Sequence, residues 1–309
     1  MATYNGEAFL QEQLTSLLNQ TFLPHELIVC DDGSSDSTLD ILERFKKISP
    51  FPCYIYMNKV NKGTAYSFKK AIDLCKGDII AFCDQDDVWL PNKLQEIEDA
   101  FNIDSNINYV ITNANIVNVN LNYVGYTLWE QRKFSKYWQN RFTRGNEFDV
   151  LFKRNIITGM TTAISRKVIN IGYDKPETTM HDAWYIYIAI LSGLKGSLLD
   201  LPLVNYRQHP NQQYGASRRK SFFKNVINRN YQSILLNIKI LEPLVKYSKE
   251  VNQNNKSLIL NNKLHHLIER KYISETKRYL RPYYIFREIF NLRYFTCGSW
   301  KNIIVDFFT

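Results

Sequence analysis

Three carboxylates follow one apolar run within four positions of the chain. The run Asp78–Cys83 predicts a buried strand, and it leads directly into Asp84, Asp86 and Asp87. Crowded carboxylates repel one another unless a cation lies among them, and their hard oxygen atoms favour Mg²⁺ or Mn²⁺. The alternative is a solvated turn before a helix, in which Asp87 or a neighbour caps the helix. The stretch therefore predicts either a metal site or a helix cap.

Two further polar clusters follow predicted strands. Thr3-Tyr4-Asn5 ends a first strand of at most three residues, and Asp31-Asp32 follows an apolar strand at 26–30. A buried strand usually needs about five residues, so the first strand is predicted to be clipped. In parallel sheets, ligands bind beyond the carboxyl ends of the strands. We therefore expect these two clusters and the acids after Cys83 to meet at one edge.

The elements that position these clusters alternate between strand and helix. The predicted strands end at residue 3 or span 26–30, 53–57, 78–83, 109–112, 116–124, 155–164 and 198–204. The predicted helices span 9–18, 39–48, 64–75, 91–101 and 178–192, with a loop or short helices at 126–144. This order predicts an α/β fold with a Rossmann-like, mostly parallel central sheet flanked by helices. Gly159, inside a predicted strand, permits close approach of the backbone.

Composition limits the class of protein. The 309 residues allow one large domain, or one domain with an appendage. Apolar runs stay shorter than the roughly 18–20 residues that a membrane helix needs, and a secretory signal is not visible. The five cysteines lack metal-ligand spacing and are expected to be reduced core residues of a cytosolic protein.

Charge divides the chain unevenly. From Arg218 onward there are 18 Lys and Arg against 6 Asp and Glu, a net charge of +12, whereas residues 1–217 carry 21 basic and 24 acidic residues. The spacing of apolar residues after Arg218 is helical. A basic helical region suggests an anionic partner: a membrane surface, nucleic acid or a charged substrate.

Five motifs, in this order, resemble those of the family 2 glycosyltransferases, which have the GT-A fold. They are Thr3-Tyr4-Asn5-Gly6-Glu7, Cys30 to Asp36, Asp84-Gln85-Asp86, His181 to Trp184, and Tyr206 to His209. The resemblance covers roughly residues 1–215, and the form Asp-Gln-Asp-Asp-x-Trp is most similar to bacterial surface-polysaccharide transferases, including rhamnosyltransferases. Asp-x-Asp alone recurs by chance, whereas the ordered set is specific.

The resemblance implies a role for each motif. Nucleotide-binding residues would be Thr3, Tyr4, Asn5, Asp31, Asp32 and Asp84, with Asp31 or Asp32 accepting from the base and Asp84 at the ribose. Asp86 and His209 would hold the Mg²⁺ or Mn²⁺ cofactor, and Asp182 would be the catalytic base. Each residue also has a purely structural alternative: a turn and helix cap at Asp32, a loop histidine at His209, and an acid at a helix N-terminus at Asp182.

Four more residues are candidates for acceptor or diphosphate contacts. They are Gly159, His181, Trp184 and Arg207. His181 could orient the base or only pack, and Arg207 could pair with phosphate or form a structural salt bridge. Core packing is the preferred interpretation for Trp184, and for Trp89 as well.

The resemblance implies an inverting, metal-dependent glycosyltransferase of cell-surface polysaccharide synthesis. Residues 1–217 would be the GT-A domain and 218–309 a helical C-terminal region. The donor would be a UDP- or dTDP-linked sugar, and the acceptor a saccharide or lipid-linked saccharide. The C-terminal region would dock on the first domain, contact a second protomer, or bind a membrane surface, which would make the cytoplasmic enzyme peripheral on the inner face of the membrane.

Two alternatives from other classes remain open at this point. One is a metal-dependent phosphotransferase or receiver-like domain, because Asp31-Asp32 at a strand end is also an acidic Mg²⁺ pocket. The other is a non-catalytic nucleic-acid binder that uses the basic tail; the acidic main body argues against it, so nucleic acid is not predicted as a partner.

Overall fold

The computed structural model describes residues 1–154, 156–172, 181–210, 212, 223–276, 280–291, 293 and 306. The chain separates into two compact units, Met1–Ser217 and Arg218–Thr309. Each is described by itself below. The assignment of residues 1–217 as the transferase domain and of 218–309 as a C-terminal region stays a prediction.

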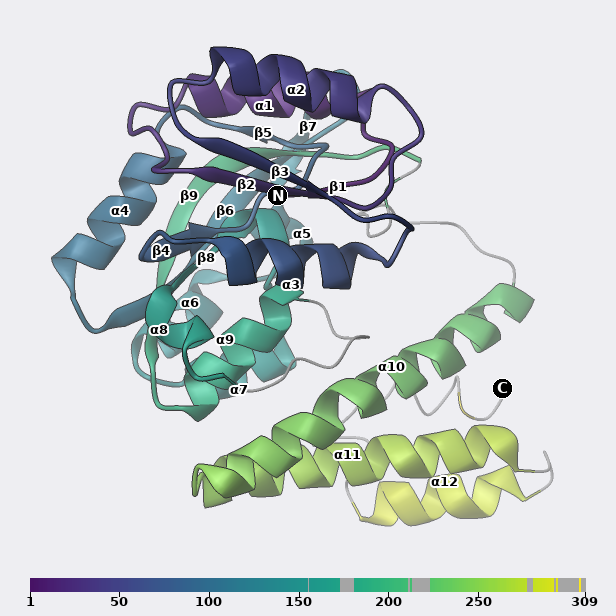
Figure 1. Cartoon of the computed structure of the whole chain (residues 1–309). Helices are drawn as coiled ribbons and strands as arrows, with labels where there is room; N and C mark the ends of the chain where they lie inside the picture. The colour runs from purple at the N-terminus through teal and green to yellow at the C-terminus, as the bar shows by residue number, and fades with distance from the viewer. Residues whose placement is uncertain are drawn as a thin grey trace. The chain divides into compact units, whose positions relative to one another are not determined.

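The first part of the chain alternates between strand and helix as predicted. The elements are β1 (Ala2–Thr3), α1 (Leu10–Leu18), β2 (Leu27–Asp31), α2 (Thr38–Ile48), β3 (Cys53–Met57) and α3 (Thr64–Leu74). The strands form a parallel sheet in the order β1-β2-β3. Figure 1 shows α1 and α2 on one side of this sheet and α3 on the other. Both faces are covered, which accounts for β2 being buried along its whole length.

A second sheet of six strands follows. Its strands are β4 (Ile79–Ala81), β5 (Val88–Trp89), β6 (Ile107–Val117), β7 (Tyr123–Thr127), β8 (Thr162–Ser165) and β9 (Lys195–Arg207). The order is β4-β8-β6-β9-β5, with β7 on β6. Only the pair β6–β9 is parallel in this sheet; β8 runs antiparallel to both β4 and β6. The α/β fold is as predicted, but parallel pairing is less extensive than expected.

The antiparallel β8 has a consequence for the site. Its second residue, Ala163, lies opposite Ala81, the last residue of β4, and its first residue, Thr162, lies opposite Ile111 in the middle of β6. The turn that precedes β8 therefore lies at the carboxyl end of β4. The predicted strand 155–164 is wrong for this reason: Gly159–Thr161 form a 3₁₀ turn (η1), and the strand begins only at Thr162.

Helices between the strands complete the first unit. They are α4 (Lys93–Ile103), α5 (Leu128–Gln131), α6 (Lys136–Thr143), α7 (Glu147–Lys153), α8 (Arg166–Ile169) and α9 (His181–Leu191). The strands predicted at 109–112 and 116–124 are instead one long strand, β6, and a turn that leads into β7. Asn155 and residues 173–180, which fall in the predicted strand and helix, lie outside the described residues.

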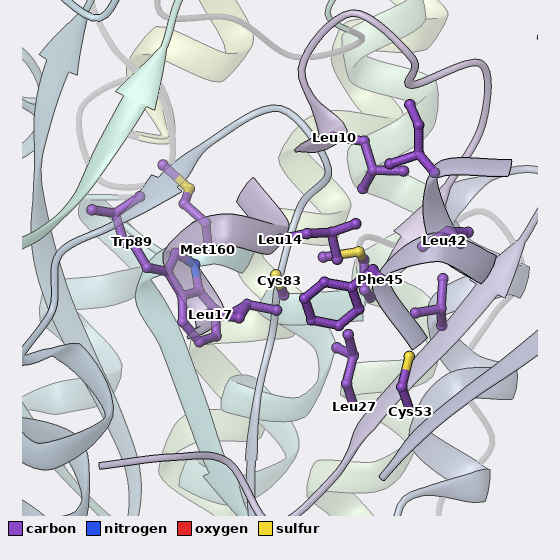
Figure 2. Close-up of a cluster of buried hydrophobic side chains, with 14 of the residues drawn as sticks. Leu10, Leu14, Leu17, Leu27, Leu42, Phe45, Cys53, Cys83, Trp89 and Met160 are labelled. Carbon is purple, nitrogen blue, oxygen red and sulfur yellow. The ribbon is translucent and has the colours of Figure 1, made fainter. Parts of the chain in front are cut away.

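The core beneath the first sheet joins several elements. Figure 2 shows Leu10, Leu14 and Leu17 of α1 in the same cluster as Leu42 and Phe45 of α2. Cys83, Trp89 and Met160 extend this cluster toward the second sheet, so Trp89 is a core residue as preferred. Of the cysteines that the structure describes, all are free and three are buried; Cys297 lies outside the described residues.

A cavity of about 720 Å³ lies behind β4. Its walls include Met1, Leu27 and Ile28 on one side and Ile79–Ala81 on the other. The lining runs along β4 as far as Cys83, and the nearby β1 has two residues, so the first strand is as short as expected. None of the acids Asp84, Asp86 and Asp87 lines the cavity, and it is therefore not the candidate site.

The C-terminal unit is helical where the structure describes it. It contains α10 (Phe223–Glu250), α11 (Asn254–Glu275) and α12 (Arg281–Phe290). A buried ion pair joins the Arg270 guanidinium to the Asp306 carboxylate at 2.7 and 2.9 Å. Within the described residues, the helices fall short of the length and hydropathy required to cross a membrane.

Candidate active site

The loops after β1 and β2 are joined by side chain–backbone hydrogen bonds. The Asn5 amide N–H donates to Ser34 Oγ (2.9 Å), and Asn5 Oδ1 accepts from the Ser35 N–H (2.9 Å). The Thr3 hydroxyl donates to Asp31 Oδ1 at 2.8 Å. The short β1 is thus held in place by its loop as well as by its pairing with β2.

Asp31 is a structural acceptor. Its Oδ1 accepts from Thr3 and from Ser34 Oγ (2.6 Å), and its Oδ2 accepts from the N–H groups of Gly33 (3.1 Å) and Ser34 (2.8 Å). A carboxylate offers about four lone-pair sites, and these four bonds occupy them. Asp31 therefore holds the turn in which Gly33 adopts a positive φ of 81°.

Asp32 holds the next loop but retains one acceptor site. Its Oδ1 accepts from Asn58 Nδ2 (2.8 Å) and from the Lys62 N–H (2.9 Å). Among the described residues, its Oδ2 accepts from the Gly63 N–H alone (2.7 Å). These bonds hold the loop just before α3, whose N-cap residue is Gly63, whereas the sequence predicts a cap for the helix after Ser34. Within the described residues, one lone pair on Oδ2 stays available.

Gln85 connects the first loop to the acidic loop. Its side-chain amide forms a reciprocal pair with Tyr4: the Tyr4 N–H donates to Oε1 (2.8 Å), and Nε2 donates to the Tyr4 carbonyl (3.0 Å). A Cβ at Gly6 would lie 2.5 Å from this Oε1 and would displace the Gln85 amide from Tyr4. Gln85, which the sequence analysis treats only as a spacer, therefore brings the Thr3-Tyr4-Asn5 loop against the acids.

The acids after β4 lie close enough to perturb one another. Burial, followed by the charges of Asp86 and Asp182, raises the pKa of Asp84 to about 7. Burial, followed by Asp86 and Asp84, raises the pKa of Asp87 well above its ordinary value. These shifts have the causes expected where carboxylates share a small volume with little solvent.

Asp86 and Asp87 have different partners. Asp86 Oδ2 lies 2.8 Å from His209 Nε2, and Phe9 packs on the His209 ring at 4.6 Å between centroids. Asp87 Oδ1 accepts from the Arg207 N–H (3.0 Å), but its buried Oδ2 has no hydrogen-bond partner in the described part of the chain. The structure thus brings the two predicted metal ligands together.

Arg207 is enclosed by protein. Its side chain is 1% exposed. Nε donates to the Asp86 carbonyl (2.8 Å), Nη1 to the Val119 carbonyl (2.6 Å), and Nη2 to the Glu12 carboxylate. These bonds favour the structural alternative over a diphosphate contact: Arg207 fastens the acidic loop to the end of β9 and to α1.

Gly159 is the point where the acids meet the start of α9. A Cβ at this position would lie 3.2 Å from His181 Nε2 and 3.4 Å from Asp84 Oδ2. Asp182 is buried, and its Oδ1 accepts from the Ala183 N–H at 2.7 Å. Burial raises the pKa of Asp182, and hydrogen bonds from the backbone N–H groups of Ala183, Asp182 and Gly159 oppose the rise. Asp84, Gly159, His181 and Asp182 therefore form one group.

His181 and Trp184 pack in the interior. The His181 ring stacks on Phe68 at 3.7 Å between centroids and meets Phe82 edge-on at 5.1 Å. Trp184 is fully buried one turn further along α9. Trp184 is thus a core residue, as preferred, and its position gives no support to an acceptor contact.

Lys93 is a buried cation that the sequence analysis does not identify. It is fully buried, its Nζ lies 4.3 Å from the Trp89 ring centroid, and it donates to the Met160 carbonyl. Burial lowers its pKa to about 8, while the nearby Cys83, Asp87 and Asp84 oppose the shift. Its position six residues after Asp87, at the start of a predicted helix, gave no signal that its side chain turns inward.

The donor set is suited to a divalent cation, although the ligands are not assembled as a closed site. In the described residues, no three His, Cys, Asp or Glu side chains are grouped as a metal cluster. Asp87 Oδ2 has no hydrogen-bond partner in the described residues, and burial, followed by the charges of Asp86 and Asp182, raises the pKa of Asp84, so a cation in this loop would be favoured. Two ligands, Asp86 and His209, fit an ion whose other ligands come from a substrate.

Fold and site together define a nucleotide-sugar transferase of the GT-A type. A sequence model of glycosyl transferase family 2 matches residues 1–172, and the chain belongs to this family. It is 31% identical to the dTDP-rhamnosyl transferase RfbG of Shigella flexneri, over 70% of this chain and 74% of that protein. It is 37% identical to the UDP-Glc:alpha-D-GlcNAc-diphosphoundecaprenol beta-1,3-glucosyltransferase WfgD of Escherichia coli, over 39% of this chain and 46% of that one.

Solved structures support the fold. The S. aureus TarS 1-349 structure in complex with UDP matches with a TM-score of 0.53 at 17% identity, covering 99% of this chain and 87% of that one. The mannosyltransferase PcManGT from Pyrobaculum calidifontis, in complex with GDP-Man and Mn²⁺, matches with a TM-score of 0.54 at 14% identity, covering 99% of this chain and 84% of that one. The predicted GT-A-like fold and glycosyltransferase class are therefore confirmed.

Proposed function

We propose that this glycosyltransferase is an inverting, metal-dependent enzyme that transfers a sugar from a UDP- or dTDP-linked donor to a saccharide or lipid-linked saccharide acceptor. The observation that carries the proposal is the position of Asp84. Burial, followed by the charges of Asp86 and Asp182, raises the pKa of Asp84, and a Cβ at Gly159 would lie 3.4 Å from Asp84 Oδ2. Motifs separated by about a hundred residues in sequence thus meet at one group of acids.

The nucleoside end of the donor would bind along the loops after β1 and β2. Asp32 is the stronger candidate for the base contact, because its Oδ2 has a lone pair to accept an imide N–H, whereas Asp31 has none. Thr3, Tyr4 and Asn5 line the same loops, and Asp84 would contact the ribose. The dTDP and UDP named for RfbG and WfgD both carry such an imide.

Asp86 and His209 would hold the divalent ion. A bound Mg²⁺ or Mn²⁺ would supply Lewis-acid stabilisation of the negative charge that develops on the leaving diphosphate. The PcManGT structure is described with Mn²⁺ beside GDP-Man, which supports a Mn²⁺ ion at this site. The chain itself holds the Asp86 carboxylate beside His209. The Arg207 Nε–H donates to the Asp86 carbonyl and fixes the backbone at this position.

Asp182 would take the proton of the acceptor hydroxyl. The acceptor oxygen forms a bond to the anomeric carbon while the bond from that carbon to the diphosphate oxygen breaks, and the proton passes to the Asp182 carboxylate. The buried setting raises the pKa of Asp182 and makes it a better base than a solvated aspartate. The Ala183 backbone N–H donates to Asp182 Oδ1 and helps to orient the carboxylate.

The two alternatives from the sequence are not proposed. A receiver-like phosphotransferase has no support from the family to which the chain belongs, and Asp31 is occupied by four protein donors. Nucleic-acid binding through the basic tail has no support from the family to which the chain belongs. A cytoplasmic location stays a prediction that agrees with the free cysteines in the described residues.

A thermal-shift screen would identify the donor. UDP-, dTDP-, GDP- and CDP-sugars would each be tested with Mg²⁺, with Mn²⁺ and without metal. We expect stabilisation by a uracil or thymine nucleotide only when the metal is present. Stabilisation by GDP-sugars alone would overturn the assignment of the base contact to Asp32, since guanine binding would need a different set of partners.

Replacing Asp182 would test its role as base. We expect Asp182→Asn to reduce turnover by about 10³-fold, within the range for loss of a general base, and to leave donor affinity nearly unchanged. Steady-state kinetics and calorimetric donor binding would measure the two quantities. Asp73→Asn, at an exposed position on α3, is the control and should retain full turnover. Substantial turnover by Asp182→Asn would remove it from this role.

A further inference from the structure

The helix α12 has two unlike sides. Ile285 is buried and packs with Ile273 of α11, and Arg281 and Glu288 are buried on the same helix. The other side is apolar yet exposed: Tyr283 is 67%, Phe286 64% and Phe290 88% exposed to solvent. Large aromatic side chains at such exposure are uncommon on the surface of a water-soluble domain unless they contact something.

These side chains belong to a patch that also includes part of α11. Tyr272 of α11 contacts Tyr284 of α12 at 5.1 Å between ring centroids, and Tyr283 contacts Tyr284 at 5.2 Å. The Arg287 guanidinium lies 5.2 Å from the centre of the Tyr284 ring. We call Tyr272, Tyr283, Tyr284, Phe286 and Phe290 the aromatic patch. It combines rings with polar ends, fully apolar rings and a cation.

The segment that carries the patch is strongly basic. Residues 218–309 have a net charge of +12. Arg287 pairs with Glu269, and Lys271 lies 4.0 Å from Glu275, but surface pairs of this kind contribute little and leave the excess positive charge in place. An anionic partner is therefore favoured electrostatically. A second copy of the same segment is disfavoured, because two net charges of +12 would be brought together.

We propose that the aromatic patch binds the surface of a membrane that contains anionic lipids. Tyrosine and phenylalanine rings at the headgroup level, with basic residues around them, are the combination that holds amphipathic helices on such surfaces. Basic residues near the surface add electrostatic attraction to anionic lipid. A ten-residue helix is only about 15 Å long, half the thickness of the hydrocarbon core, so α12 would lie along the surface.

Sedimentation of the full chain with vesicles would test this inference. Vesicles of phosphatidylcholine alone would be compared with vesicles of phosphatidylcholine and phosphatidylglycerol at 7:3. We expect binding to the anionic vesicles only, and weaker binding at high salt. The double variant Tyr283→Ser/Phe290→Ser should bind about tenfold more weakly or worse, since it loses two rings from the contact.

The matched control is Ile103→Ser, which removes an apolar side chain that is 86% exposed on α4 in the other unit. It should bind vesicles as the wild type does. Both substituted rings are exposed, and circular dichroism would verify that the variants remain folded. Equal vesicle binding by the wild type and the double variant would overturn the inference. So would a wild type that does not bind vesicles but is a dimer by light scattering, with the dimer lost in the double variant. None of these readouts depends on the proposed transfer reaction.

Discussion

The loops after β2 and after β4 contain the same kinds of residue but use them differently. After β2, Asp31 and Asp32 are buried, and seven hydrogen bonds from protein donors reach their oxygens. After β4, Asp84 and Asp87 face each other and Asp86 with few donors, and their pKa values are raised. Paired acids at a strand end can therefore be held mostly by protein donors in one loop and lack such donors in another.

The difference shows which loop needs a ligand. A carboxylate with all its lone pairs satisfied stabilises the folded protein without help. Crowded carboxylates with an unpartnered oxygen, such as Asp87 Oδ2, cost free energy until a proton or a cation compensates them. Gln85 joins the acidic loop to Tyr4 after β1, and the neighbouring Asn5 is bonded to Ser34 and Ser35 after β2. The loops after β1 and β2 therefore help to hold the acidic loop in place.

The largest difference between the loops should appear in protein stability. Asp32→Asn should lower the free energy of unfolding by about 1–3 kcal/mol, because buried donors around it lose a charged acceptor. Asp87→Asn should change that free energy by less than about 0.5 kcal/mol or raise it, because the raised pKa of Asp87 already favours a neutral carboxyl. Urea denaturation without metal would measure both. Equal losses in the two variants would contradict the comparison.

A smaller effect is expected in the pH dependence of stability. The pKa of Asp84 is about 7 in the folded protein and near its ordinary value of 3.8 when unfolded, so the folded state binds more protons between these values. The contribution of Asp84 to stability must then fall as pH rises from about 4 to about 7.

Comparison of the wild type with Asp84→Asn would isolate this contribution. The stability of Asp84→Asn relative to the wild type should rise over this interval. The control is Asp104→Asn: hydrogen bonds from Asn106 lower the pKa of Asp104, so its contribution is lost as pH falls instead. A wild type and Asp84→Asn with parallel pH profiles would show that Asp84 titrates as an ordinary acid.

Much of this arrangement follows from local sequence signals. Strand–helix alternation predicts β2, α2, β3 and α3 closely, because apolar periodicity and glycine turns are local. Asp32 follows β2 and Asp86 follows β4, which belong to different sheets, and the Gln85–Tyr4 hydrogen bonds join the acidic loop to the loop after β1. The family resemblance adds Asp182 and His209, which residue chemistry alone would not connect to the acids.

Other features depend on long-range pairing that sequence patterns do not encode. The apolar run 155–164 has the composition of a strand, but its first part turns at Gly159 so that β8 can enter antiparallel between β4 and β6. The inward side chain of Lys93 and the enclosed Arg207 arise from partners 67 and 195 residues away, Met160 and Glu12. Lys93 is therefore missed, and Arg207 stays ambiguous until the structure is known.

Binding of a nucleoside diphosphate with and without Mn²⁺ tests the central claim most directly. Calorimetric titration of the wild type with UDP or dTDP should show binding at least about tenfold tighter with the metal. Asp86→Ala should lose most of this gain in affinity, because the metal then loses one of its two proposed protein ligands. Identical affinities with and without Mn²⁺, or a full metal effect in Asp86→Ala, would contradict the assignment of the acidic loop as a metal and diphosphate site.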